Sequence, residues 1–323
     1  MKSTINKKKV NKELQKLYNL DFINELNKIP RIAIYLFGGA IRDLMLGKPW
    51  KEADIRIVLN LPWEEREKAI ENALKKEKIE GKERIKNENL TVYRFLPKGS
   101  TTKHAIDLSL VSTIKDNLPD FTINSLFFNL ISGELLDQYG GINDLNNKLL
   151  KTVKDPFEQF KQEPQMMLRA VKCVCQFNLQ IEGKTLEALK KNSRLAEKTL
   201  QLIYDKKTGI LIELFQSNVY RGFLYNPEKC FELFKDIGIL NAFWNFIEKN
   251  SDLKKENTIK IENPFQDQPP GQFEKNIAKF LIFLAKDFVG DKQNNFYFIK
   301  KLLVLDRPKQ YLDFEVDVEK IKY

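Results

Sequence analysis

The sequence predicts an α+β protein in which a small N-terminal α/β domain precedes an all-helical remainder. Over residues 30–150, short β-branched and aromatic runs alternate with helical stretches, a pattern typical of strands and helices that share one domain. From Pro156 onward the strand signals fade, and apolar residues recur at helical spacing. Because the chain has 323 residues, more than one typical domain, two or three domains are expected.

The N-terminal domain is predicted to open with an apolar strand, a glycine turn and a short helix. The run at 32–37 is apolar, and the helical stretch at 40–46 stops at Gly47. A Ser132-Gly133 turn separates the last two expected strands. The expected strands lie near residues 32–37, 54–59, 90–96, 104–111, 126–131 and 134–137, and the expected helices lie near 40–46 and 62–78.

The remainder is predicted to be helical. Residues 157–179 carry apolar side chains at helical spacing. Residues 251–271 are rich in Asn, Asp, Gln and Pro and are the strongest candidate for a linker between helices. Further helices are expected near 184–204, 207–216, 227–236, 240–249, 272–288 and 294–304.

The composition favours a polyanionic partner and a reducing compartment. The net charge is +10, which suits phosphate contacts. The alternative explanation is genome composition, because AT-rich genomes encode proteins that are rich in lysine and asparagine. The three cysteines have no metal-binding spacing and are expected to be free thiols. No apolar run is long enough to span a membrane. We therefore expect no membrane association and a cytoplasmic protein, with an organelle matrix as the alternative.

The glycine turn is the first candidate for chemistry. Gly38 and Gly39 join the expected strand to the expected helix. A strand that feeds a glycine turn and a helix directs backbone N–H groups toward one point, which suits a polyphosphate.

A carboxylate pair follows the turn. Glu52 and Asp54 are two residues apart on an expected strand, so their side chains share one face. Two adjacent carboxylates repel each other unless a cation lies between them, and Mg²⁺ prefers such oxygen ligands. Asp107, within another expected strand, supplies a third carboxylate or belongs to the polar face of an edge strand. Together these features indicate phosphoryl or nucleotidyl transfer.

The turn and the carboxylates also carry a family resemblance. Residues 35–58 (YLFGGAIRDLMLGKPWKEADIRIV) resemble the class II tRNA nucleotidyltransferases, or CCA-adding enzymes, and the bacterial-type poly(A) polymerases, whose signature runs GGxxRDxxLG and then DxD. Glu52 stands where the family has its first aspartate. The matching residues are Gly38, Gly39, Arg42, Asp43, Leu46, Gly47 and Asp54.

The resemblance continues downstream and covers roughly residues 30–190. Residues 120–125 (DFTINS) resemble the family block RRDFTINA, and residues 136–145 (LDQYGGINDL) resemble iDpfgGxxDL. Residues 163–172 (EPQMMLRAVK) resemble the neck motif EDPxRxLRAxR.

The resemblance implies a polymerase β-like nucleotidyltransferase head domain followed by helical neck, body and tail. The residues themselves indicate a basic helical extension at 1–24. The expected divisions after it are the head at 25–150, the neck at 151–215 and the body and tail at 216–323. The implied activity is template-independent addition of nucleotides to RNA 3′ ends, as in tRNA CCA addition or poly(A) synthesis. Its partners would be RNA and a nucleoside triphosphate, and its cofactor Mg²⁺ or Mn²⁺.

The carboxylate pattern and the resemblance together assign roles to single residues. Glu52, Asp54 and Asp107 are the expected catalytic carboxylates, and the first two are the expected metal ligands. The expected nucleotide-binding residues are Gly38, Gly39, Arg42, Asp120, Asn124, Glu163 and Arg169. Within this set, Arg42 would bind the triphosphate or form a salt bridge, and Asp120 would select the ribose 2′-hydroxyl.

The nucleotide end of the site departs from the family pattern. Leu118 and Pro119 stand where the family has two arginines, and Met166 stands where the neck motif has its first arginine. Methionine donates no hydrogen bond, so base reading by this route is not expected. Three interpretations remain: a polymerase with relaxed nucleotide choice, a weak or inactive RNA-binding homologue in an RNA–protein assembly, and a nucleotidyltransferase with a non-RNA acceptor.

Overall fold

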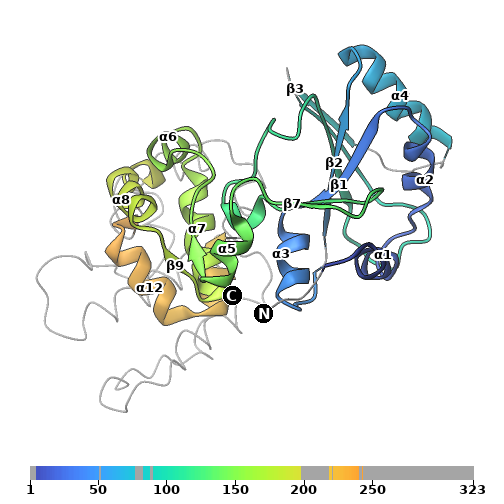
Figure 1. Ribbon diagram of the computed structural model, residues 1–323. Helices are drawn as coiled ribbons and strands as arrows, with labels where there is room; N and C mark the ends of the chain where they lie inside the picture. Colours follow the sequence, from blue (N-terminus) through green and yellow to red (C-terminus); the bar gives the residue numbers. More distant parts are fainter. Residues whose placement is uncertain are drawn as a thin grey trace, which may run out of the picture. The chain divides into compact units, whose positions relative to one another are not determined.

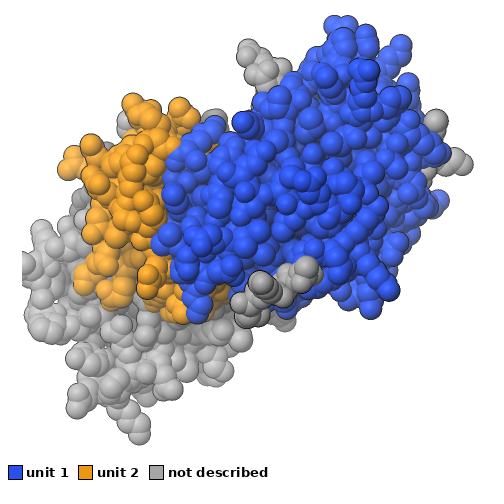
Figure 2. All heavy atoms as spheres, in the orientation of Figure 1, with its two compact units in different colours: residues 1–154 blue, residues 155–323 orange. Residues whose placement is uncertain are grey.

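A computed structural model of the protein describes residues 5–50, 52–76, 83–87, 90–197, 218–219, 221–239 and 242. The chain divides into two compact units, residues 1–154 and residues 155–323 (Figure 2). In the first unit strands and helices alternate, whereas the second is mainly helical over its described residues (Figure 1). The predicted α+β class is therefore confirmed.

Among the described residues, unit 1 contains a seven-stranded mixed sheet in the order β3-β4-β5-β2-β1-β6-β7. The central pair β2 and β5 is parallel, and each other neighbouring pair is antiparallel. The strands are β1 (Ile32–Phe37), β2 (Ala53–Leu59), β3 (Glu83–Asn87), β4 (Leu90–Phe95), β5 (Ile106–Val111), β6 (Phe127–Asn129) and β7 (Leu135–Leu136), with the short β8 (Leu149–Leu150) outside this sheet.

One face of this sheet forms the hydrophobic core of unit 1. Side chains alternate along a strand, so Leu36, Ile55 and Leu108 point to one face and are fully buried. Apolar residues of four helices join them in one cluster. These helices are α1 (Lys7–Gln15), α2 (Asp21–Asn27), α3 (Gly39–Met45) and α4 (Trp63–Lys76), and the unit also contains η1 (Thr122–Asn124) and α5 (Gly141–Asn146).

The N-terminal segment is part of this core and not a separate extension. Val10 and Leu14 of α1 are fully buried, and Phe22 of α2 packs edge-to-face on Phe95 of β4. The prediction of a basic extension at 1–24 followed the lysines at 7–9. The buried apolar residues, spaced four apart on α1, were the signal that contradicted it.

The expected strands and helices of unit 1 are present, with shifts at their ends. The strand expected at 126–131 ends early as β6, because the Asn129 side chain accepts hydrogen bonds from the N–H groups of Ile131 and Ser132 and turns the chain. Strand β3 was not predicted, because its sequence, ERIKN, is mostly polar.

The described part of unit 2 is built from helices. They are α6 (Pro156–Gln162), α7 (Gln165–Phe177), α8 (Gly183–Asn192), α11 (Arg221–Tyr225) and α12 (Pro227–Asp236), with the short strand β9 (Gln180–Ile181). The helical spacing predicted at 157–179 is confirmed, and this stretch forms two helices, because the chain breaks at Glu163 and Pro164. Proline disfavours a helical conformation of the residue before it and has no N–H to donate.

Several predictions fall beyond the described residues. The helices expected near 207–216, 272–288 and 294–304 and the linker at 251–271 lie outside them, as does nearly all of 240–249. The division between neck and body therefore stays a prediction. Within the described part of the chain, no helix is both long and apolar enough to cross a membrane.

Candidate active site

Asp54 and Asp107 lie side by side on the sheet face opposite the core. Asp54 of β2 pairs with Asp107 of the parallel strand β5 and with Phe37 of the antiparallel strand β1. Paired residues on neighbouring strands point to the same face. The structure thus brings together two of the three carboxylates expected to be catalytic.

The environment of Asp54 disfavours its charged form. Burial, and then the nearby carboxylates of Asp107 and Glu52, raise the pKa of Asp54 to about 7. Gly38 has a φ of +74°, and a Cβ at this position would lie 3.2 Å from Oδ2 of Asp54. The glycine turn therefore allows the backbone to approach the carboxylate closely.

Asp107 already has a cationic partner. Nε and Nη2 of Arg94, on β4, each donate a hydrogen bond of 2.7 Å to the Asp107 carboxylate. Strand β5 lies between β4 and β2, so the alternative of a polar face on an edge strand is wrong.

Glu52 lies just before β2 and is the most exposed of the three carboxylates. Its side chain is 68% exposed, and Oε1 lies 3.5 Å from Nδ1 of His104. Among the described residues, no three His, Cys, Asp or Glu side chains converge closely enough to hold a metal ion. A metal bound here would have to draw Glu52 or Asp107 away from its present partner.

Arg42, Asn124 and Asp120 form one hydrogen-bonded chain beside the glycine turn. The Arg42 guanidinium is buried, donates to Asp43 at 2.8 Å and donates through Nη1 to Oδ1 of Asn124 at 2.6 Å. Nδ2 of Asn124 in turn donates to Oδ1 of Asp120 at 2.9 Å. A Cβ on Gly39 would lie 3.1 Å from Nη2 of Arg42. The salt bridge considered for Arg42 is thus present, and it coexists with a link to the Asp120 segment.

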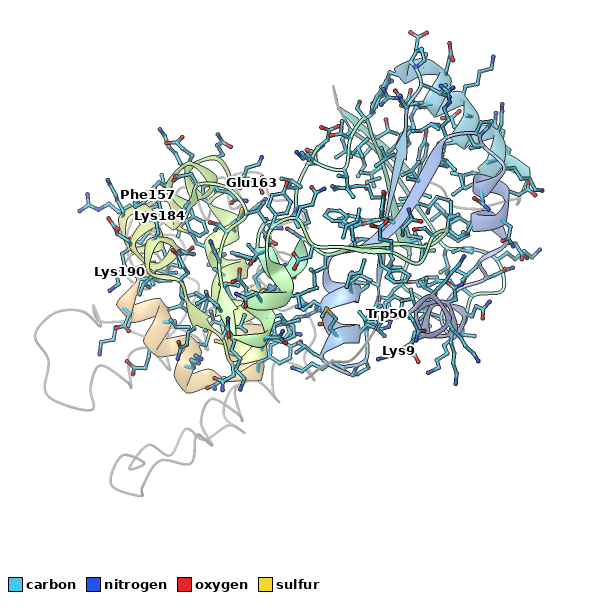
Figure 3. The ribbon with its side chains drawn as sticks, in the orientation of Figure 1. Lys9, Trp50, Phe157, Glu163, Lys184 and Lys190 are labelled. Carbon is cyan, nitrogen blue, oxygen red and sulfur yellow. The ribbon has the colours of Figure 1, made fainter. Side chains whose placement is uncertain are left out.

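The remaining expected residues lie in unit 2. Arg169 of α7 forms an ion pair with Glu163 at 3.3 Å, and both side chains are partly exposed. Met166 is fully buried, so it presents no group to a base at the surface. Figure 3 labels Glu163, Phe157, Lys184 and Lys190 in this unit.

Three residues near the carboxylates were missed in the sequence. Arg94 pairs with Asp107, and Arg56, two residues after Asp54, shares its face. The hydroxyl of Tyr18 hydrogen-bonds the backbone of Ala53 between Glu52 and Asp54, and burial raises the pKa of Tyr18 to about 12. The alternation of β2 could have identified Arg56, whereas Arg94 and Tyr18 are brought here only by the fold.

Residues 34–151, which contain the glycine turn, Asp54, Asp107 and the Arg42 chain, match the family described as the Poly A polymerase head domain. This stretch is therefore similar to the head domain of that family. Its relatives include a CCA-adding enzyme of Lactobacillus helveticus, 28% identical over 169 residues that cover 51% of this chain and 42% of the relative. The CCA-adding enzyme of Ligilactobacillus salivarius is 25% identical over 226 residues, covering 68% and 53%. The chain thus aligns with about half the length of these curated relatives.

Solved structures agree with the head-domain assignment at the level of the fold. A CCA-adding enzyme of Thermotoga maritima, complexed with tRNA, superposes with a TM-score of 0.57 at 20% identity, covering 96% of this chain and 70% of that one. A CCA-adding enzyme with ATP gives the same TM-score at 21% identity, covering 93% and 66%. The resemblance to the class II family is confirmed, at low sequence identity.

Proposed function

We propose that this protein is an RNA nucleotidyltransferase that adds nucleotides to RNA 3′ ends without a template. The observation that carries the proposal is Asp54, a carboxylate with a pKa of about 7 that abuts the glycine turn and pairs with Asp107. Such a group is poised to bind a cation. The likeness to CCA-adding enzymes, including ones solved with tRNA and with ATP, supports RNA and a nucleoside triphosphate as the partners.

The three carboxylates repel one another when they are ionised, and a hard divalent cation would relieve this repulsion. Mg²⁺ or Mn²⁺ would be held by Asp54 and Glu52, with Asp107 as the third oxygen donor, and would supply positive charge to the reacting phosphate and hydroxyl oxygens. Asp54 would then remain ionised at neutral pH, because a nearby cation lowers the pKa of a carboxylic acid.

The hydrogen-bonded residues Arg42, Asn124 and Asp120 would hold the nucleotide. Arg42 has a buried guanidinium at the glycine turn, and its bonds to Asp43 and Asn124 fix its direction. It would offer donors to the triphosphate, while Asp120, held by Asn124, would accept a hydrogen bond from the ribose 2′-hydroxyl. Most of the catalytic effect would come from positioning and charge compensation.

One contact favours a second function. Because Arg94 bonds both oxygens of Asp107, the third carboxylate is occupied without metal. Together with Leu118, Pro119 and Met166 in place of arginines, this contact favours a weakly active or inactive RNA-binding homologue that serves as a subunit of an RNA–protein assembly. The net charge of +10 suits RNA binding in both cases.

The test is incubation of the purified protein with tRNA, a generic RNA and a non-RNA acceptor bearing a hydroxyl. Each labelled nucleoside triphosphate is supplied separately with Mg²⁺ or Mn²⁺. Extension of either RNA supports the proposal, and extension of tRNA alone narrows it to tRNA. RNA binding without extension favours the second function, and transfer only to the non-RNA acceptor contradicts both.

A further inference from the structure

The strand that carries Asp54 also carries a buried arginine that no role proposed above uses. Arg56 follows Asp54 by two residues in β2, so its side chain leaves the sheet on the same face. It is only 3% exposed. A buried guanidinium is retained only when polar partners replace its water, so the partners of Arg56 indicate what it does.

The guanidinium of Arg56 holds the loop at 112–119 through backbone carbonyls. Nη1 donates to the carbonyl of Asp116 at 2.9 Å and to that of Ile114 at 3.3 Å. Nη2 donates to the carbonyl of Asn117 at 2.7 Å. Three carbonyls of four consecutive residues are thus bound by one planar side chain, a fork that lysine cannot reproduce.

The same guanidinium is fixed on its other side by two aromatic rings. Its central carbon lies 4.4 Å from the ring centroid of Phe37 and 5.4 Å from that of Phe127. The two rings stack on each other at 5.4 Å. Phe37 immediately precedes the glycine turn, so Arg56 is held by β1 and β6 while it holds the loop.

The clamped loop ends at the nucleotide side of the site. Only Leu118 and Pro119 separate Asn117 from Asp120. The loop also closes on itself, because the Asp116 carboxylate accepts from the N–H groups of Ser112 and Thr113. Proline restricts the last link further. A displacement of the carbonyl of Asn117 would therefore be transmitted to Asp120.

We propose that Arg56 is a positioning residue that fixes the Asp120 loop to the strand carrying Asp54. The clamp holds the loop that leads through Leu118 and Pro119 to Asp120, by donors that reach its backbone from the sheet. Its consequence for the nucleotide rests on the proposed function; the clamp itself does not.

The test compares Arg56→Met and Arg56→Lys with the parent, and Arg84→Met is the matched control. Arg84 is an exposed arginine of β3 that bonds Glu71 and is remote from the loop in the strand order. Hydrogen exchange of the amides at 112–121 should accelerate about tenfold or more in Arg56→Met, while β1 and β2 stay protected. Arg56→Lys, which keeps the charge and most of the volume, should give an intermediate rate. Arg84→Met should leave the loop unchanged.

In an active parent, Arg56→Met should also raise the KM for the nucleotide about tenfold with a smaller change in kcat, partly restored in Arg56→Lys. An unchanged loop exchange in both Arg56 variants overturns the proposal, as does an equal acceleration across the whole of unit 1. If Arg56→Met does not fold, Arg56→Lys alone decides by the same exchange criterion. A parent that adds no nucleotide contradicts the proposed function, and loop exchange still decides the clamp.

Discussion

Asp54 lies in an environment that changes its acidity strongly from that of the free side chain. Burial is the first cause, and the carboxylates of Asp107 and Glu52 add to it, which raises the pKa of Asp54 from 3.8 to about 7. The folded protein without metal therefore binds a proton at Asp54 more tightly than the unfolded chain does. By linkage, the contribution of Asp54 to stability is greatest below pH 4 and is lost as the pH rises to about 7.

Asparagine does not titrate, so the difference in unfolding free energy between Asp54→Asn and the parent, both without metal, should favour the variant more at pH 8 than at pH 5. A shift of about three pKa units corresponds to at most about 4 kcal/mol, and solvent access at the partly buried side chain reduces that figure. Urea unfolding of parent and Asp54→Asn at both pH values, with and without Mg²⁺, measures the difference. Mg²⁺ should stabilise only the parent. Parallel pH dependences of the two proteins would contradict the assigned environment.

Base selectivity is also decided by single residues. Met166 is buried, and Leu118 and Pro119 carry no donor side chains, so no arginine at these positions reads the incoming base. We expect kcat/KM values for the four nucleotides to differ by about 100-fold or less, whereas sites that hydrogen-bond their substrate discriminate by about 10⁴ or more. Steady-state kinetics with each nucleotide measures the ratio. A strict order of CTP and then ATP would show that other residues read the base.

Among the strands, those with a periodic apolar pattern were predicted correctly, whereas a strand with few apolar residues was not. Strand β1 is an apolar run, and β2 and β5 alternate apolar with polar residues, so the positions of these three strands were predicted from sequence. Glu52 was expected on the same strand as Asp54, but β2 begins only at Ala53. Strand β3 is polar and is defined only by its pairing with β4. Arg94 could not be placed at Asp107 from the sequence, because that contact depends on strand order.

The N-terminal helix α1 gives an element-scale prediction. Leu14→Ala should lower the free energy of unfolding by about 2–4 kcal/mol, since Leu14 is fully buried in the core of unit 1. Lys12→Ala, an exposed change on the same helix, should have an effect below about 0.5 kcal/mol. Chemical denaturation of both variants is the measurement. Equal, negligible effects would mean that residues 1–24 are a detached extension after all.

At the scale of the whole molecule, positive charge is the feature most relevant to a polyanion. The net charge is +10, and α8 with the turn after it carries the exposed residues Lys184, Lys190, Lys191 and Arg194. Figure 3 labels Lys184 and Lys190 in unit 2 and Lys9 of α1 in unit 1. Basic side chains are thus present on both units.

RNA binding should therefore weaken steeply with salt and need neither metal nor nucleotide. The double variant Lys190→Glu/Lys191→Glu should lose affinity and reduce the slope of log K against log salt by about 1–2, as expected for two lost phosphate contacts. The matched control Lys68→Glu/Lys75→Glu makes the same charge change on exposed residues of α4. Fluorescence anisotropy over a salt series measures the slopes. Equal losses of RNA affinity in both double variants would show that binding depends on net charge alone and not on Lys190 and Lys191.

If Asp54 lies at the centre of a nucleotidyl-transfer site, its removal should stop RNA extension, and the variant Asp54→Ala measures this. Asp21→Ala, which removes an exposed carboxylate at the start of α2, is the control. With Mg²⁺, labelled nucleotide and RNA, the parent and Asp21→Ala should extend the RNA, and Asp54→Ala should be slower by about a thousandfold with unchanged RNA affinity. Extension by Asp54→Ala at the rate of the parent would contradict a role of Asp54 in nucleotidyl transfer.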